Sequence, residues 1–511
     1  MSVIAVNPIL SGFYPDPSIC AVGEDYYLVN STFAYFPGLP VMHSRDLAHW
    51  EQLGNACNRQ SQLPLQGCGH SEGLFAPTIR YHDGMFYIIC TNISGGGNFI
   101  ITADNPAGPW SEPYFIKGAD GIDPSLFFDE DGVCYYIGTH PNPKGCRYDG
   151  DWHIWIQELD IERMELVGKP EDVWSGAMKN VIWPEGPHLY KKDGYYYIMH
   201  AEGGTGPNHA VTVCRSRNIW GPYENNFCNP VLTHRHLGKD YPVRYVGHAD
   251  MIETPAGEWY MTMLAVRQVE GYTMLGRETF LARVVWEDGW PVVNPGVGKL
   301  TEKVQINLPE WKAGQNCGMY DFAGACHTLG NEFLFLRNPD EDMYRIKEGE
   351  GLYLKCSDVL LNQKASPSYI AVRQRHHQFT SGTLIDIKSV GENRAGIALV
   401  QSNEYYLRLE VSGKYVSAIL CEMGNDRILG SAEINSEKAV LFIRVSGLTA
   451  VLGIREENRE RIVVENVDIR GLSTEIASGF TGCTTGIYAT AKTIYSDRQE
   501  VRFLNFSYQE F

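Results

Sequence analysis

The sequence of 511 residues contains no pair of cysteines with the spacing CxxC, although it has thirteen cysteines in all. Scattered cysteines of odd number provide neither a disulfide framework nor the ligand spacing of a structural zinc site, so we expect buried free thiols in a reducing compartment. The first residues, MSVIAVNPILSGFYPDP, lack a basic segment followed by a long apolar run. We therefore expect no signal peptide, no membrane-spanning helix and a cytoplasmic location.

Positive charge is also scarce. The chain has 43 Lys and Arg residues against 61 Asp and Glu residues, which gives a formal net charge of −18. Such a surface repels phosphate backbones and anionic lipids, so nucleic acids and membranes are not expected as partners, whereas neutral ligands are not disfavoured. The hydrophobic content of 44% predicts a folded chain, and its length predicts more than one domain.

Long amphipathic helical patterns are scarce as well, which disfavours a parallel α/β fold. Instead, one pattern recurs five times: a polar or small start, an apolar pair, a turn, and then an aromatic-rich run. The copies begin with DPSIC at Asp16, APTIRY at Ala76, DPSLFF at Asp123, EGPHLY at Glu185 and HADMI at His248. Three of them contain Asp-Gly between apolar runs, a strong hairpin signal. Five copies roughly 47 to 63 residues apart predict a five-bladed β-propeller, with a β-sandwich as the alternative.

The repeat ends near residue 300, and a different pattern follows. We expect the propeller to cover residues 1–300, a polar connector to cover 301–319, and an antiparallel β-sandwich packed on the propeller to cover 320–511. Short alternating segments such as LIDIKSV, YYLRLEVSG and KAVLFIRVSG support this all-β interpretation. An independent carbohydrate-binding module is the alternative for the second half.

Three carboxylates stand at the beginning of the predicted inner strands. Aligning the copies places Asp16 and Asp123 at equivalent positions, with Glu185 just before the equivalent Gly186. These positions face the central cavity of a propeller, where crowded carboxylates raise each other's pKa. Hydrolysis of a glycosidic bond requires one protonated and one ionised carboxyl group, and this set supplies both. A single Asp-Pro-Ser would be an ordinary turn, but the repetition favours a catalytic site.

At these residues the chain resembles glycoside hydrolase family 43, in particular its β-xylosidases and α-L-arabinofuranosidases. NPILSGFYPDPSI resembles the opening segment of that family, GIDPSLFFD and EGPHLYKKDGYYYIMHAEGGT resemble two further segments, and LGRETF a fourth. The resemblance implies that Asp16 is the general base, Asp123 the group that raises the pKa of the proton donor, Glu185 the general acid, and Arg277 a contact of the bound sugar. It also implies an inverting mechanism, for which the carboxyl groups of Asp16 and Glu185 should lie about 6.5–9.5 Å apart.

The second half resembles the C-terminal module of the same enzymes, through FLRNPDEDMY, VRQRHHQF and GFTGCTTGIYAT. We expect the loop at Phe480 to pack toward the mouth of the propeller and to shorten the substrate cleft. A shortened cleft would favour removal of one terminal sugar over internal cleavage.

Other candidate binding residues have a structural alternative. The aromatic residues Phe33, Phe36 and Phe75 either stack on sugar faces or belong to the propeller core; relatives often carry Trp at the position of Phe75. His248 is a substrate-binding candidate at the axial position, and the resemblance also implies that it could help to hold Ca²⁺ near that axis. Glu202, after the fourth copy, is a rival for the acid role, although a structural contact is the better interpretation.

The sequence thus predicts an exo-acting inverting glycosidase that releases terminal β-D-xylose or α-L-arabinofuranose from oligosaccharides derived from xylan or arabinoxylan. No cofactor is required for this reaction. A non-catalytic carbohydrate-binding propeller is the alternative function, and a retaining fructosidase-type propeller is a third. The sequence does not choose between the two pentoses. It also leaves the assembly state open, although the resemblance implies a homo-oligomer, because relatives are often oligomers.

Overall fold

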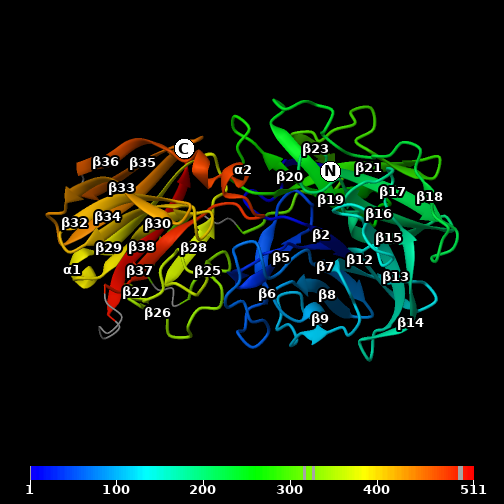
Figure 1. Cartoon of the computed structure of the whole chain (residues 1–511), viewed down its shortest axis with the longest axis horizontal. Coiled ribbons are helices and arrows are strands. Elements are labelled where there is room, and N and C mark those ends of the chain that lie inside the picture. The colour runs from blue at the N-terminus through cyan, green and yellow to red at the C-terminus, as the bar shows by residue number, and fades with distance from the viewer. Residues whose placement is uncertain (1, 315–317, 325–327, 458, 493–498) are drawn as a thin grey trace.

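The five repeated segments form the inner parts of five four-stranded antiparallel sheets around one axis (Figure 1). The structure is a computed structural model that describes residues 2–314, 318–324, 328–457, 459–492 and 499–511. The inner strands are β2 (Ser18–Val22), β7 (Thr78–His82), β11 (Ile122–Phe128), β15 (Glu185–Lys192) and β19 (Val243–Glu253). Each contacts the next in turn, and β19 contacts β2, which closes the ring. The predicted five-bladed propeller is confirmed.

The outer strands follow in chain order within each blade. The first blade continues with β3 (Asp25–Val29), β5 (Gly38–Ser44) and β6 (Glu51–Cys57), and the second with β8 (Met85–Asn92), β9 (Gly97–Ala103) and β10 (Tyr114–Phe115). The third continues with β12 (Cys134–Pro141), β13 (Trp152–Asp160) and β14 (Glu165–Trp174), and the fourth with β16 (Tyr195–Glu202), β17 (Ala210–Ser216) and β18 (Glu224–Asn225). The fifth continues with β20 (Trp259–Arg267), β21 (Glu278–Glu287) and β22 (Trp290–Val293). The predicted Asp-Gly hairpins form: Asp83 and Gly84, between β7 and β8, both have positive φ, as such a turn requires.

The two ends of the propeller are joined by pairing of distant segments. Strand β1 (Val3–Val6) pairs with β23 (Lys303–Ile306). An isolated β-bridge between Leu10 and Thr279 then holds the N-terminal segment against the last blade, before the segment reaches the axis. The N-terminal segment therefore reaches the first inner strand already fixed against β21.

The second half is a β-sandwich of two eight-stranded sheets. One sheet contains β24 (Met319–Asp321), β26 (Tyr344–Lys347), β27 (Gly351–Lys355), β29 (Gln378–Asp386), β34 (Lys438–Ser446), β35 (Thr449–Glu456), β36 (Arg459–Asp468) and β38 (Glu500–Glu510). The other contains β4 (Tyr35–Phe36), β25 (Leu334–Leu336), β28 (Tyr369–Arg373), β30 (Arg394–Val400), β31 (Tyr406–Ser412), β32 (Tyr415–Glu422), β33 (Asn425–Glu433) and β37 (Thr484–Thr490). The helices are short: α1 (Ile387–Val390), η1 (Arg470–Leu472) and α2 (Thr474–Ala477). In the described part of the chain, no helix has the length and apolarity needed to cross a membrane.

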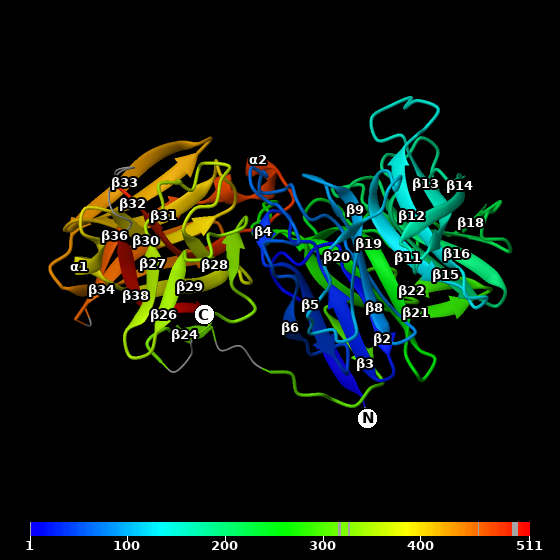
Figure 2. The same ribbon diagram turned by 90° about the horizontal axis from the view of Figure 1, so that it is seen from below.

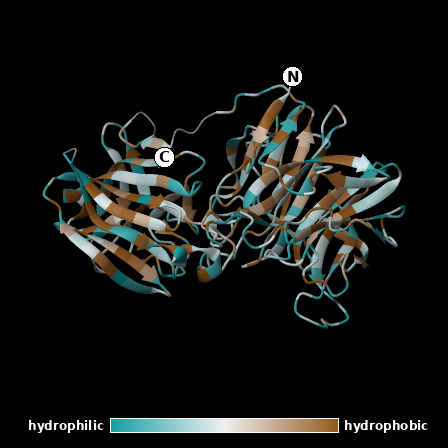
Figure 3. Cartoon of the chain, turned by 90° about the horizontal axis from the view of Figure 1, so that it is seen from above, coloured by the Kyte–Doolittle hydropathy of each residue, from teal (hydrophilic) through white to brown (hydrophobic). Residues whose placement is uncertain are grey.

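The two domains are packed against each other and share a sheet (Figure 2). Strand β4 lies in the first blade by sequence, yet it pairs with β25 and becomes the edge strand of a sandwich sheet. One apolar cluster extends from Leu74 and Phe99 of the propeller to Phe379 and Phe506 of the sandwich. Apolar residues lie along the strands of both domains (Figure 3). The sandwich is therefore part of the same folded body as the propeller.

A polar network crosses the propeller axis two residues after the aligned positions Asp16, Ala76, Asp123, Gly186 and His248. The residues two positions on are Ser18, Thr78, Ser125, His188 and Asp250. Asp250 accepts hydrogen bonds from Ser18 Oγ at 2.7 Å and from the guanidinium of Arg80 at 2.8 and 3.3 Å. His188 Nδ1 in turn accepts from Arg80 at 2.9 Å and lies 3.0 Å from Ser125 Oγ. The blades that hold the site are thus tied together by one buried ion pair and its partners.

Candidate active site

The backbone at the start of the repeats has an unusual conformation. Asp16, Asp123, Gly186 and His248 have φ values of 52°, 52°, 59° and 49°, whereas Ala76 is not in this region. The pairing register also shifts at these starts in β11, β15 and β19. Left-handed conformations of non-glycine residues are costly and concentrate at functional sites, and register shifts redirect side chains. The four matching φ values support the alignment of the repeats.

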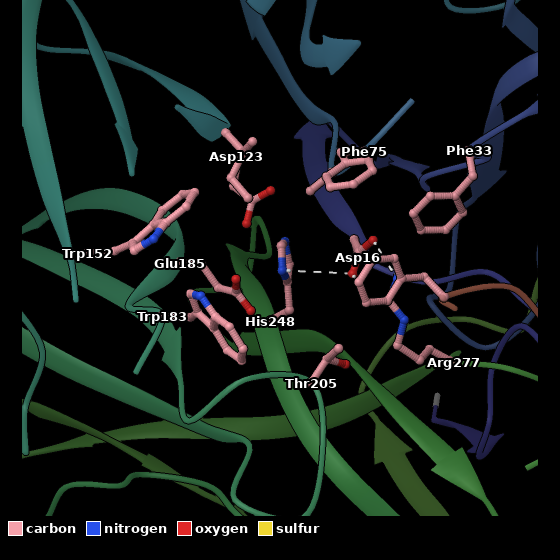
Figure 4. Close-up of a pocket in the computed structure, with 13 residues that line it drawn as sticks. Asp16, Phe33, Phe75, Asp123, Trp152, Trp183, Glu185, Thr205, His248 and Arg277 are labelled. Atoms are coloured by element: carbon pink, nitrogen blue, oxygen red, sulfur yellow. Dashed lines mark hydrogen bonds and ion pairs between the residues drawn. The ribbon is translucent and has the colours of Figure 1, made fainter. Parts of the chain in front are cut away.

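The redirected side chains enter one pocket with a volume of about 270 Å³. The predicted residues that line it are Asp16, Phe33, Phe75, Asp123, Glu185, His248, Arg277 and Phe480. In Figure 4, Glu185 lies on one side of His248, and Asp16 and Arg277 lie on the other. The structure therefore brings together the three carboxylates that the sequence placed at the axis.

Asp16 is held as an ionised carboxylate. Arg277 donates two hydrogen bonds to it, at 2.8 Å to Oδ1 and 3.3 Å to Oδ2, and Ser31 Oγ donates a third. His248 Nδ1 lies 3.9 Å from Asp16 Oδ1. Burial alone would raise the pKa of Asp16, but Arg277, His248 and Ser31 outweigh that effect and lower it below its ordinary value. Asp16 can therefore act as a base.

Asp123 and Glu185 have the opposite character. Burial raises the pKa of Asp123 to about 6; the charge of His248 opposes this shift and that of Asp16 adds to it. Burial also raises the pKa of Glu185 well above its ordinary value, and the charges of Asp123 and Asp16 raise it further. Asp123 Oδ2 accepts the N–H of Gly186 at 3.1 Å, directly beside Glu185. Because neighbouring acids titrate together, the pair retains a proton that Glu185 can donate.

Three phenylalanine rings form the apolar wall beside Asp16. The ring centroids of Phe33, Phe75 and Phe480 lie between 5.7 and 6.1 Å apart. The Arg277 guanidinium lies over two of them, 5.6 Å from Phe33 and 5.3 Å from Phe480. Phe480 comes from the sandwich, and its backbone N–H donates to Ser71 Oγ of the propeller at 2.7 Å. The C-terminal domain thus supplies a side chain to the pocket, in the place expected for the Phe480 loop.

Two candidates do not belong to the pocket. Of the two interpretations of Phe36, sugar stacking is wrong and a core position is the better one: it lies in β4, pairs with Phe335 and is buried in the core that joins the domains. Strand pairing with the sandwich turns this side chain away from the cavity that Phe33 reaches. Glu202 is also buried elsewhere, and its Oε2 accepts the N–H of Ala177 at 2.8 Å. The structural interpretation of Glu202 is the better one.

The sequence interpretation missed several residues that line the pocket. Trp152 and Trp183 lie on the side of Glu185, and Thr205 lies below His248, between Glu185 and Arg277 (Figure 4). Trp183 has φ 46°, and its backbone N–H donates to Gly150 O at 2.8 Å, so a segment distant in the sequence fixes the backbone that carries its ring. The position of Trp183 two residues before Glu185 was a sequence signal that it lies near the site. The conformation of its loop could not be predicted from the sequence. Ile122 completes this part of the lining.

The pocket offers few ligands for a metal ion. Within the described ranges, no group of three or more His, Cys, Asp or Glu side chains is arranged to hold one. Among the described residues, Asp16 is the carboxylate within 4.0 Å of His248, at 3.9 Å, and it is already bonded by Arg277. Calcium prefers six to eight oxygen ligands, so the residues present do not fit such a site. A role of His248 in binding calcium stays a prediction.

Known proteins share this architecture along the whole chain. The family model described as glycosyl hydrolases family 43 matches residues 5–291, and a model described as the beta xylosidase C-terminal concanavalin A-like domain matches 320–509. A xylosidase/arabinosidase of Butyrivibrio fibrisolvens is 49% identical over 97% of both chains, and a non-reducing end alpha-L-arabinofuranosidase of Bacteroides ovatus is 39% identical over 95% of this chain and 91% of its own. The crystal structure of a xylan beta-1,4-xylosidase from Bacillus halodurans superposes with a TM-score of 0.92 at 33% identity, covering 99% of this chain and 100% of that one. With two matched domains and a pocket built from the segments that carry the resemblance, the chain belongs to glycosyl hydrolase family 43.

Proposed function

We propose that the chain is an exo-acting, inverting glycosidase that releases terminal β-D-xylose, α-L-arabinofuranose or both from xylan- or arabinoxylan-derived oligosaccharides. One observation carries the proposal. A single pocket contains an ionised carboxylate, Asp16, opposite a carboxyl pair, Asp123 and Glu185, whose pKa values are raised. The names of the similar enzymes support pentosides as substrates.

In the proposed reaction, Asp16 accepts a proton from a water molecule that attacks the anomeric carbon. Glu185 donates its proton to the departing glycosidic oxygen on the opposite face of the sugar. Asp123 stays ionised beside Glu185 and holds the proton there until it is transferred. A single displacement of this kind inverts the anomeric configuration, and it requires a separation of about 6.5–9.5 Å between the carboxyl groups of Asp16 and Glu185.

The pocket supports removal of one terminal sugar. Its volume of about 270 Å³ lies just below the usual range for small-molecule sites and suits one small ring. Phe480 of the sandwich closes it on the side of Phe33 and Arg277. A polymer could not continue past this wall, so we propose that the non-reducing end enters the pocket and that the leaving group extends past Trp152 and Trp183.

The first experiment compares the rates of hydrolysis of an aryl β-D-xyloside and an aryl α-L-arabinofuranoside. Proton NMR during the first turnovers identifies the anomer that appears first. We expect the anomer opposite to that of the substrate; retention of configuration would contradict the proposed mechanism and would favour a covalent intermediate. Turnover of neither glycoside would count against the proposed substrate class.

The Asp16→Asn variant separates the proposal from a binding function. A glycosidase should lose turnover by at least about 10²-fold, because general acid–base groups contribute about 10²–10⁴-fold. Binding of a xylo-oligosaccharide, measured by calorimetry, should remain detectable. If the wild-type protein binds oligosaccharides but hydrolyses none of them, the carbohydrate-binding alternative is correct.

A further inference from the structure

The loop that carries Asp16 (residues 11–16) rests on the sandwich domain. Three consecutive residues of the loop meet three consecutive residues of the sandwich in reverse order. Ser11 Oγ donates to Arg375 O. Gly12, with φ 93°, packs so closely on Gln374 O that an added Cβ would lie 2.7 Å from it. Phe13 O accepts a hydrogen bond of 2.9 Å from Arg373 Nε.

The opposite side of the same loop is bonded to the last propeller blade. The N–H of Gly12 donates to Glu278 Oε1 at 3.0 Å, and the N–H of Tyr14 donates to Arg277 O at 3.1 Å. Thr279 Oγ1 donates to Tyr14 O at 2.6 Å. The loop is therefore fixed between β21 and the sandwich. Strand β21 begins directly after Arg277, which binds the Asp16 carboxylate.

Arg373 is unusual among these contacts. It is 3% exposed, its guanidinium lies 4.8 Å from the Phe13 ring and 4.3 Å from the Tyr14 ring, and its Nη2 has no hydrogen-bond partner. The ionisable groups that influence its pKa are the phenols of Tyr14 and Tyr35, and no carboxylate of the described residues is among them. Burial of a cation without a carboxylate costs free energy, and an apolar side chain of similar size would often be at least as stabilising. Stability alone therefore gives little reason for an arginine at this position.

We propose that Arg373 is a positioning residue of the sandwich that fixes Asp16 in the geometry needed for attack by water. The proposal rests on the role of Asp16 as the base. The guanidinium fixes the Phe13 carbonyl and holds the aromatic rings of Phe13 and Tyr14, and Asp16 follows two residues later. Even a small shift of this loop would move the Asp16 carboxylate relative to Arg277 and to the anomeric carbon of the bound sugar. Such misplacement reduces turnover more than binding.

The test is a set of full-length variants assayed on whichever aryl pentoside the wild-type protein hydrolyses faster. Arg373→Met should lower kcat at least about tenfold while KM changes less than about threefold. Arg373→Lys should recover most of the loss, because its ammonium group can still donate to Phe13 O. On the Asp16→Asn background, Arg373→Met should cause no further loss, since the effect acts through Asp16.

Arg337→Met is the matched control. Arg337 is also a buried sandwich arginine that donates to a propeller backbone carbonyl, Cys68 O at 2.6 Å, but it supports a different loop. Its loss should leave the kcat of the Asp16-dependent reaction within about threefold of wild type. An equal loss in both variants, an unchanged kcat in Arg373→Met, or an undiminished loss on the Asp16→Asn background would overturn the proposal.

Ser11→Ala provides a milder perturbation if Arg373→Met does not fold. It removes the hydroxyl that bonds Arg375 O and that also contacts Glu278 and Arg267 of the last blade, and it should lower kcat, as Arg373→Met does. Unchanged kinetics would count against the proposal. A wild-type protein that hydrolyses neither pentoside would contradict the proposed function itself. An active wild type with an unaffected Arg373→Met variant would contradict only the role of Arg373.

Discussion

Asp250→Asn is expected to destabilise the propeller strongly, because this carboxylate is the centre of the axial network. Each of its oxygens accepts three hydrogen bonds. Oδ2 accepts from Ser18, Arg80 and a backbone N–H at 2.7–3.1 Å, and Oδ1 accepts from Tyr190, Arg80 and a backbone N–H at 2.6–3.3 Å. An asparagine removes the charge and places an NH₂ group opposite three donors. It also leaves the half-buried Arg80 without the carboxylate partner at the centre of the network. Breaking a buried pair in this way costs about 3–5 kcal/mol.

For a domain of this size, about 2 °C in Tm per kcal/mol gives an expected decrease of about 6–10 °C. Differential scanning fluorimetry or calorimetry measures it at pH 7, with Glu437→Gln as the control, because the Lys388–Glu437 pair is exposed to solvent, which screens it, and its loss should leave Tm almost unchanged. Burial would raise the pKa of Asp250, but Arg80, His188 and Tyr190 lower it below its ordinary value of 3.8. A lowered pKa contributes stability above the unfolded-state value and loses it as pH falls, so the difference between wild type and variant should shrink below about pH 4. A decrease in Tm of less than about 2 °C at pH 7 would refute the reasoning.

Three further predictions concern the pocket. Glu185→Gln should lower kcat by about 10²–10⁴-fold on an aryl glycoside with a poor leaving group and much less on one with a good leaving group, as steady-state kinetics on the two substrates will show. Asp123→Asn should move the basic limb of the pH profile of kcat/KM to lower pH, because the negative charge that helps to raise the pKa of Glu185 is lost; an unmoved limb would argue against that coupling. Phe480→Ala should raise KM for short oligosaccharides about tenfold or more, because the ring that packs on Phe33 and Arg277 is lost, and an unchanged KM would show that the sandwich does not shape the sugar site.

The contrast between Phe33 and Phe36 shows where sequence reasoning stopped. Both residues follow the first repeat and look alike in the sequence. Phe33 reaches the pocket, whereas Phe36 pairs with a strand of the second domain, from residue 335. The partner that decides between the two positions is about three hundred residues away, and a local pattern carries no information about it. The same holds for Trp152, whose approach to the site depends on how neighbouring blades pack.

The sequence by itself determined the repeating unit, and with it the fold and the central site residues. Turn chemistry and strand alternation are local, so five similar segments were enough to predict the blades, and their alignment was enough to place Asp16, Asp123 and Glu185 at one axis. Only the tertiary structure decided which other side chains complete the site. The partners of Asp250, the course of Phe36 and the contact of Arg373 with the Asp16 loop join residues that are far apart in the chain, and such contacts depend on the register and packing of whole domains.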